Sequence, residues 1–266
     1  MDSDENQLQS WIGRSQTVMD TVGPTPVQAL HATLDHAALP VEPGSVLPPL
    51  WHWLYFLPPV PLPRRMWAGS EFEFRSPIRV GDRLARSSTI DSVRAREGRS
   101  GKLVFVRVRH ALHCNSAPDP ALLEFHDIVY REARRAGESE PPPHSAPTGA
   151  PWQREIVPDD VLLFRYSALT FNGHRIHYDR RYVTEVEGYP GLVVHGPLIA
   201  TLLLDLLQRE LPGAEVAAFR FRALRPSFDL HPLRLNGALQ PDGRSVRLWA
   251  QDHEGWLTMD ASATLH

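Results

Sequence analysis

The chain has 266 residues, of which 42% are hydrophobic and 22% are charged, and 28 Lys and Arg against 31 Asp and Glu give a formal net charge of -3. This composition excludes an intrinsically disordered chain, and the near-neutral charge disfavours a protein that binds the phosphate backbone of nucleic acids. The single cysteine, Cys114, excludes an intramolecular disulfide and a cysteine-based zinc or iron–sulfur site.

Residues 1–5 are acidic, whereas a secretory signal peptide begins with positive charge. No apolar run approaches the roughly 18 residues that span a membrane. We therefore expect a cytoplasmic protein with neither a membrane nor a nucleic acid as its partner.

A helix is predicted near the start of the chain, over residues 26–35. Thr25 is a suitable N-cap, Pro26 suits the first helical position, and Gln28 can complete a capping box. A proline-rich stretch follows at 43–63. Four strands are then predicted, over residues 70–75, 82–94, 102–113 and 121–131.

Residues 132–152 separate this region from the rest of the chain. They are mostly Glu, Ala, Arg, Gly, Ser and Pro, and they include three consecutive prolines at 141–143. Such a segment cannot bury apolar surface and stiffens toward polyproline II. We predict an N-terminal half over 1–135, a linker over 136–151 and a C-terminal half over 152–266.

The second half follows the same plan with a longer helix, predicted over residues 197–211. Four strands are predicted after it, over residues 215–224, 233–239, 245–252 and 256–265. No repeat of residue identities is visible. A helix followed by antiparallel strands, present twice, predicts an α+β protein in which each half wraps a curved sheet around a helix, as in the hot-dog arrangement.

The start of the second long helix is a candidate for binding negative charge. Gly196 is predicted as the N-cap and Pro197 as the first helical residue. The first N–H groups of a helix have no partner within it, and its dipole is positive there. This end of the helix can therefore hold a carbonyl oxygen that becomes negative during a reaction.

Two side chains upstream of this helix suit proton transfer. His177 is a candidate general acid and base because imidazole titrates near neutral pH, and Asn172 can orient water or a carbonyl without carrying charge. The chain has 13 histidines, so His177 by itself would be a weak candidate. Its position five residues after Asn172 and shortly before the helix strengthens the prediction.

The string from Ser167 to Tyr178 resembles a known motif. It is similar to the hydratase motif Asp-x-Asn-Pro-Ile-His of MaoC-like, double hot-dog enoyl-thioester hydratases. The likeness is strongest to the branch with type 2 hydroxyacyl-thioester dehydratases and mesaconyl-CoA or itaconyl-CoA hydratases. The resemblance implies that the chain is a double hot-dog and that His177 is the catalytic histidine.

The chain departs from the general motif at three positions. Asn172 stands in place of the motif aspartate, His174 in place of its asparagine and Arg175 in place of its proline. An amide cannot abstract a proton. Either His177 acts while Asn172 positions the water, or an acid from elsewhere, such as Asp179, takes part.

Val194-His195-Gly196 resembles the His-Gly of the same family at the start of its central helix. The resemblance implies that the Gly196 N–H binds the thioester carbonyl. Four neighbours are expected to contact the substrate. They are His195, His174, Arg175 and Tyr178.

The first half also resembles this branch, in segments 66–69, 80–82, 101–106 and 127–131, so the likeness spans nearly the whole chain. It has no Asn…His string and no His-Gly helix start. The resemblance implies that the N-terminal half is catalytically silent and shapes the acyl pocket.

The expected reaction is the reversible hydration of a 2-enoyl thioester or dehydration of a 3-hydroxyacyl thioester. No cofactor is expected, because coenzyme A or a carrier protein is part of the substrate. A dicarboxylic acyl group such as mesaconyl or itaconyl would need a cation for its distal carboxylate. The candidates flank the motif and are Arg165, Arg175, Arg180 and Arg181.

Several alternatives stay open. They are a 3-hydroxyacyl-carrier-protein dehydratase, an acyl-CoA thioesterase and a non-catalytic protein that binds acyl thioesters. A zinc site at His174 and His177 is disfavoured because no helical His-Glu-x-x-His pattern surrounds them, and no Gly-x-Ser-x-Gly elbow supports a serine hydrolase. Two hot-dog halves in one chain predict either a monomeric pseudo-dimer or a homodimer.

Overall fold

The computed structural model describes residues 8–37, 40–57, 66–98, 101–131 and 142–266. The strands of the N-terminal half are β1 (Ser15–Thr21), β2 (Met66–Phe74), β3 (Arg83–Gly98), β4 (Gly101–Cys114) and β5 (Leu122–Arg131). Those of the C-terminal half are β6 (Trp152–Ile156), β7 (Val216–Ala223), β8 (Leu233–Leu239), β9 (Ser245–Gln251) and β10 (Leu257–Leu265).

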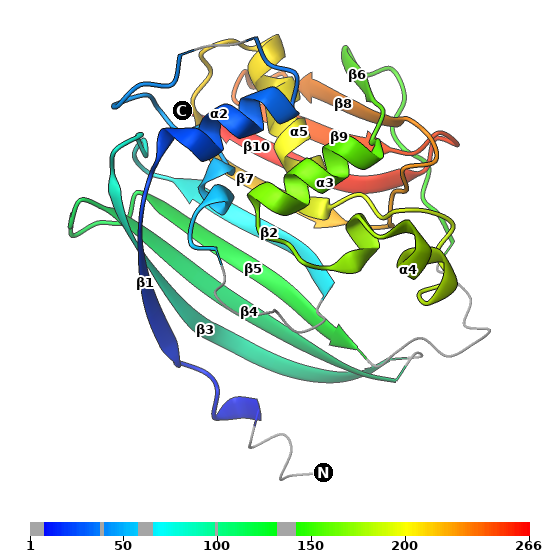
Figure 1. Cartoon of the computed structure of the whole chain (residues 1–266), viewed down its shortest axis with the longest axis horizontal. Coiled ribbons are helices and arrows are strands. Elements are labelled where there is room, and N and C mark those ends of the chain that lie inside the picture. The colour runs from blue at the N-terminus through cyan, green and yellow to red at the C-terminus, as the bar shows by residue number, and fades with distance from the viewer. Residues whose placement is uncertain (1–7, 38–39, 58–65, 99–100, 132–141) are drawn as a thin grey trace.

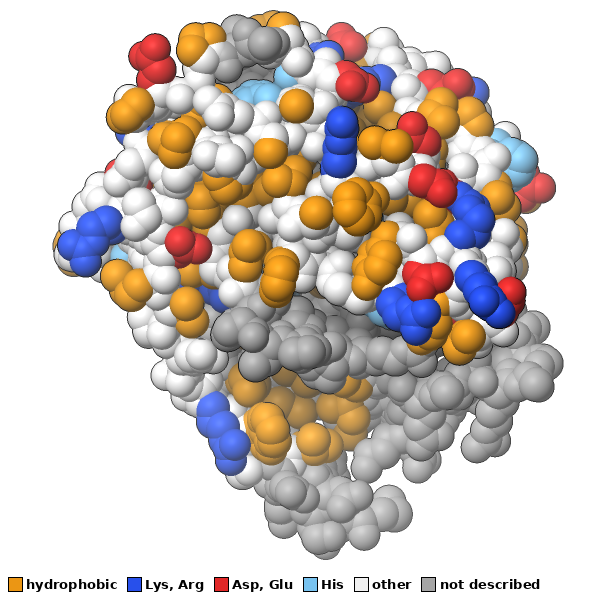
Figure 2. Space-filling view, viewed as in Figure 1, with side chains coloured by type: hydrophobic (Ala, Val, Ile, Leu, Met, Phe, Trp, Pro, Cys, Tyr) orange, Lys and Arg blue, Asp and Glu red, His pale blue; other side chains and the backbone are white. Residues whose placement is uncertain are grey.

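The helical elements are fewer and mostly short. They are α2 (Pro24–Thr33), the 3₁₀ turn η1 (Trp51–Leu54), α3 (Asp160–Leu169), the 3₁₀ turn η2 (Arg175–His177), α4 (Arg180–Glu185) and α5 (Gly196–Glu210). Figure 1 shows the helices on one side of a strongly curved sheet. In the same view, hydrophobic side chains are scattered among charged ones across this helical side (Figure 2).

All ten strands that the described residues form belong to one sheet, in the order β1-β3-β4-β5-β2-β7-β10-β9-β8-β6. The two halves of this order mirror each other, because β1, β3, β4, β5 and β2 correspond in chain order to β6, β8, β9, β10 and β7. The structure therefore confirms a duplicated α+β architecture of the kind expected for two hot-dog repeats.

The two halves meet where β2 pairs antiparallel with β7. Gly69 of β2 lies opposite Arg222 of β7, and a Cβ atom at Gly69 would lie 2.5 Å from the carbonyl oxygen of Phe221. Such a distance is far inside van der Waals contact, so only glycine lets the backbones of the two halves approach in this way. The pairing makes the two sheets continuous.

Helix α5 is the central helix of the C-terminal half. Pro197 lies in its first turn, where a missing N–H costs no helical hydrogen bond, and most of its residues after Pro197 are buried. It contacts β8, β9 and β6. This burial fixes where the amino end of α5 lies relative to the strands.

The predicted helices and strands are found within a few residues of their expected bounds, with two corrections at helix starts. The N-cap of α2 is Gly23 rather than Thr25, because Pro24 already has helical geometry. The N-cap of α5 is His195 rather than Gly196, which is the first helical residue. Both corrections shift a helix start toward the N-terminus by one or two residues.

Six elements were not predicted, namely β1, η1, β6, α3, η2 and α4. β1 is a mostly exposed edge strand with little apolar pattern, and the short β6 follows the proline-rich segment directly. Helix α3 begins at an Asp159 N-cap whose side chain accepts from the Leu162 N–H. Of its ten residues only Leu163, Tyr166 and Ser167 are buried, so its sequence carries little of the apolar periodicity that predicts a helix.

The predicted linker lies partly outside the described residues, at 136–141. In the part that is described, Ser145 forms an isolated antiparallel bridge to Trp256.

In the parts of the chain that the structure covers, no helix has both the length and the apolar character required to cross a membrane.

Candidate active site

His177 lies in η2 and is buried, with 8% of its surface exposed. Its Nδ1 lies 2.7 Å from the carbonyl oxygen of Val193. Because a carbonyl only accepts, Nδ1 carries the proton and Nε2 is left to exchange one with a reactant. Burial lowers the pKa of His177 to about 4, against a raising effect of the Val193 bond. The imidazole is therefore neutral at pH 7, which is the form that can accept a proton.

Local hydrogen bonds shape the loop that carries His177. After α3 the chain turns at Phe171, whose φ is 51°, and the Asn172 Oδ1 then accepts from the His174 N–H at 3.1 Å. The Val193 N–H donates to the carbonyl of Ile176, so the segments before and after α4 are tied together beside His177. These contacts bring His177 close in space to the start of α5, although the two lie far apart in the sequence.

His195, the N-cap of α5, stacks on His177. The two ring centroids are 3.8 Å apart with an interplanar angle of 19°. Burial lowers the pKa of His195 well below its usual range, and the neighbouring His177 acts in the same direction. The structure thus places the ring of His177 directly beside the amino end of α5.

Gly196 is the first residue of α5, so its N–H lies outside the intrahelical hydrogen bonds. Among the residues that the structure describes, this N–H has no hydrogen-bond partner. A Cβ atom at Gly196 would meet only the Met259 Cε, at 4.0 Å. The amide can therefore donate to a ligand oxygen near His177.

The remaining predicted site residues differ in where they lie. Asn172 and His174 are half-buried, and the ring of His174 is 5.6 Å from that of His177. Tyr178 is 39% exposed, and its hydroxyl donates to the Gly173 carbonyl. Arg175 is exposed and pairs with Asp179.

The expectation that the His195 side chain contacts the substrate needs correction. Its exposed fraction is 0%. The ring is enclosed by His177, Tyr166 and the hydroxyl of Ser167, so it reaches no ligand directly in this arrangement. Sequence reasoning missed Ser167 as its partner, although Ser167 opens the recognised string.

The alternative acid, Asp179, is occupied by other contacts. It caps α4 by accepting from the Tyr182 N–H, and it pairs with the Arg175 guanidinium, both of which lower its pKa. Within the described part of the chain, no hydrogen bond or ion pair joins it to His177. The geometry therefore favours His177 over Asp179 as the group that moves protons.

Three of the four arginines that flank the motif are held by carboxylates. Arg175 pairs with Asp179, Arg180 with both Asp160 and Asp229, and Arg181 with Glu185. Arg165 has no ion-pair partner within the described ranges and is exposed.

A second cluster of titratable side chains lies in the N-terminal half and was not predicted. Glu124 of β5 is 2% exposed and accepts from the rings of His52 and His126 and from the Trp53 indole N–H. Next to it, the half-buried His110 forms a hydrogen bond with the Ser88 hydroxyl. His52 and Trp53 of η1 thus contact Glu124 of β5, which lies 72 and 71 residues further along the chain. No local sequence pattern reveals such a contact. The inward-facing alternation of Leu122, Glu124 and His126 was the available signal.

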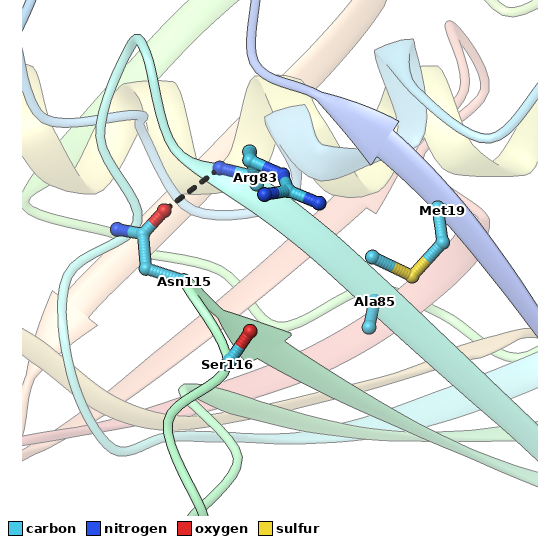
Figure 3. A pocket seen from close by; sticks show the side chains of 5 residues that line it. All are labelled: Met19, Arg83, Ala85, Asn115 and Ser116. Carbon is cyan, nitrogen blue, oxygen red and sulfur yellow. Dashed lines mark hydrogen bonds between the residues drawn. The ribbon is translucent and has the colours of Figure 1, made fainter.

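Two surface hollows have linings that include neither His177 nor Gly196. One of about 240 Å³ is lined by Met19, Arg83, Ala85, Asn115 and Ser116, on the side of the sheet away from the helices (Figure 3). Another, of about 380 Å³, is lined by β2, β5, β7 and β10. Within the described ranges, no three or more His, Cys, Asp or Glu side chains are arranged to hold a metal ion.

The chain is similar to known proteins over most of its length. A model of the family described as hydroxyacyl-thioester dehydratase type 2 matches residues 52–229. The mesaconyl-C(4)-CoA hydratase of Chloroflexus aurantiacus is 40% identical over 276 residues, which cover 96% of this chain and 97% of that protein.

Solved structures show the fold. A MaoC-like dehydratase has a TM-score of 0.74 at 16% identity and covers 97% of this chain and 99% of its own. A Mycobacterium tuberculosis protein described as a double hotdog fold has a TM-score of 0.61 at 15% identity, with 96% of each chain covered. At this low identity the similarity concerns the fold alone, and it confirms the expected double hot-dog architecture.

Proposed function

Because the chain belongs to the hydroxyacyl-thioester dehydratase type 2 family, it is a hydro-lyase that acts on acyl thioesters, and we propose that it hydrates a short dicarboxylic enoyl-CoA such as mesaconyl-CoA. The Chloroflexus aurantiacus relative is similar over nearly the full length of both chains, which supports a substrate of this class. The contact that carries the mechanism is the stacking of His177 beside the amino end of α5.

Hydration begins with proton removal from water. The neutral Nε2 of His177 takes a proton as the water oxygen forms a bond to C3 of the enoyl group. The C2–C3 double bond opens, and its electrons delocalise onto the thioester oxygen. The Gly196 N–H donates to that oxygen, where the negative charge develops.

The second step returns the proton to carbon. The imidazolium of His177 gives its Nε2 proton to C2, the enolate carbonyl re-forms, and the site is neutral again. Burial disfavours the imidazolium, as the lowered pKa of His177 reflects, so the ring readily gives the proton up. This sequence uses one histidine, one amide and water, and it calls for no metal or redox cofactor.

The other parts of the proposal concern the whole chain. The substrate carries coenzyme A rather than a carrier protein. The N-terminal half, over 1–135, shapes the acyl pocket and takes no direct part in the chemistry. The continuous β2–β7 pairing supports a chain that forms the pseudo-dimer without a second copy.

The test is a hydration assay over crotonyl-, mesaconyl-, itaconyl- and long-chain enoyl-CoA, read as loss of enoyl absorbance with thiol release monitored in parallel. We expect the dicarboxylic substrates to give the highest kcat/KM, with no thiol released. His177→Ala should lower kcat by about 100-fold or more, because it removes the only proton carrier of the proposed mechanism.

Binding of a non-hydrolysable acyl-CoA should persist in the same variant. Release of thiol at the rate of enoyl loss would instead identify a thioesterase. Equal hydration by His177→Ala and the parent protein would remove His177 from the mechanism.

A further inference from the structure

The side chain of His195 is fully buried but hydrogen-bonded at only one of its two nitrogens. Nε2 lies 2.8 Å from the Ser167 hydroxyl. Nδ1 is buried and has no hydrogen-bond partner among the described residues. An unpaired buried polar atom destabilises a fold. Hydrogen bonding therefore does not explain why a histidine occupies this buried position.

The face of the ring supplies that explanation. It lies flat against His177, with the centroids 3.8 Å apart. The hydrogen bond from the His177 Nδ1 to Val193 fixes one atom of the catalytic ring but leaves the ring free to swing about that bond. A flat neighbour on one face removes this freedom and fixes the direction in which Nε2 points.

His195 is itself held in place from α3. Ser167 is 5% exposed and bonds to Nε2, and Tyr166 contacts the ring edge-on at 5.0 Å. The other titratable group that faces His177 is His174, on the same loop. Among the described residues, neither ring of the stacked pair forms a hydrogen bond or ion pair with a carboxylate.

We propose that Ser167 and His195 are positioning residues, a buried pair that fixes the plane of the His177 ring and so aims the Nε2 atom that exchanges the proton. The proposal rests on the proposed function for its kinetic consequences. His195 then acts through His177 and does not touch the substrate.

The experiment compares Ser167→Ala, His195→Ala and His195→Phe. We expect kcat to fall about 10-fold in Ser167→Ala and about 100-fold in His195→Ala, as small misplacements of a catalytic group can produce. KM should change by less than about twofold, since substrate binding is not altered. His195→Phe keeps a flat ring against His177 and should recover much of the loss seen in His195→Ala.

Ser70→Ala is the matched control. Ser70 is also a buried serine, 2% exposed, whose hydroxyl accepts from an aromatic N–H, that of Trp67, but it lies in the N-terminal half. This variant removes one buried hydrogen bond and should keep the parent kcat. It shows what a loss of general stability does to the assay.

The pH profile separates positioning from a purely structural role. In His195→Ala water can enter beside His177, which weakens the desolvation that lowers the pKa of this histidine. The pKa of His177 then rises, so the neutral ring becomes protonated at a higher pH than in the parent. The acid limb of the kcat profile should therefore shift to higher pH. A purely structural role would lower the unfolding temperature and leave this limb unmoved.

A readout without turnover completes the test. The Nδ1 proton of His177, held against a buried carbonyl, should give a slowly exchanging NMR signal that disappears in His177→Gln. It should persist in Ser70→Ala and broaden in Ser167→Ala and His195→Ala. If the signal responds so but the parent hydrates no acyl thioester, the proposed function fails and the positioning stands.

Two outcomes would overturn the positioning. One is a parent-like kcat in both Ser167→Ala and His195→Ala together with an unchanged His177 signal in these variants. The other is a loss of activity in Ser70→Ala equal to that in Ser167→Ala. Should His195→Ala fail to fold, the kcat and the His177 signal of Ser167→Ala decide between these results.

Discussion

Neither the backbone conformation at Gly196 nor the packing around it requires a glycine. Its φ is not among the positive values in the chain, and an added Cβ would meet only the Met259 Cε at 4.0 Å. At the first position of a buried helix, alanine would be accommodated. Close approach of a ligand to the Gly196 N–H gives a physical reason for the absent side chain.

We therefore expect Gly196→Ala to fold normally but to lose activity. The unfolding free energy should stay within about 1 kcal/mol of the parent, because glycine and alanine differ by about that amount within helices. kcat/KM should fall by up to about 100-fold, since the methyl group displaces the thioester oxygen from the amide. Urea unfolding and steady-state kinetics on the same preparation check both parts. Full activity would remove Gly196 as the oxyanion donor.

The pairing of β2 with β7 joins the two halves at the element level. Gly69 permits this pairing, because a side chain there would press on the carbonyl of Phe221. The adjoining Phe72 and Phe219 lie opposite each other and are both buried. The position of the N-terminal half relative to the C-terminal half therefore depends on a backbone contact in the middle of the sheet.

Gly69→Ala should destabilise the protein by about 1–3 kcal/mol, the usual cost of overpacking a well-packed site. Gly23→Ala serves as the comparison because its added methyl group has nothing within 4 Å. That control should lose less than about 1 kcal/mol, for the change of an N-cap. Chemical denaturation measures both variants. Identical midpoints for Gly69→Ala and the parent would contradict the close approach of β2 and β7.

The molecule as a whole carries several buried groups whose pKa values are displaced downward. His110 has its pKa lowered to about 3 by burial, and the pKa of Asp205 is lowered to about 2 by His36 and Arg209 against the effect of its own burial. Glu124 has its pKa lowered well below the usual range by His126 and His52, against its own burial. In each case the folded state binds a proton less readily than the unfolded state.

Stability should therefore fall as the pH falls. The contribution of His110 is complete above its unfolded pKa of 6.5 and is lost progressively toward pH 3, and that of Glu124 is lost as the pH drops through its folded pKa. Urea midpoints measured from pH 7 to pH 4 should decrease continuously. A midpoint independent of pH would contradict these shifts.

Glu124→Gln tests the buried cluster at one pH. Removal of one partner leaves the polar groups of His52, His126 and Trp53 poorly matched, and the expected loss at pH 7 is about 3 kcal/mol. Glu73→Gln, at an exposed ion pair, should change stability by less than about 1 kcal/mol. Equal stability of Glu124→Gln and the parent would show that the carboxylate charge is dispensable.

Local patterns predicted much of this protein. Pro26 and Pro197 with their neighbours predicted the two helix starts to within two residues. Apolar runs punctuated by glycine predicted the strands, because such preferences act within a few residues. The resemblance of residues 167–178 identified His177 and the family. The duplicated plan was also visible, since each half repeats the order of helix and strands.

Contacts between distant segments could not be read in this way. The stacking of His195 on His177 and its bond to Ser167 depend on how α3, η2 and α5 pack together. The cluster around Glu124 and the close approach at Gly69 likewise join residues far apart in the chain. Residue types and short-range spacing determined which chemical groups the chain contains. Packing determined which of these groups lie next to each other. Burial and long-range contacts arise only when the sheet packs against the helices, so the sequence by itself does not show them.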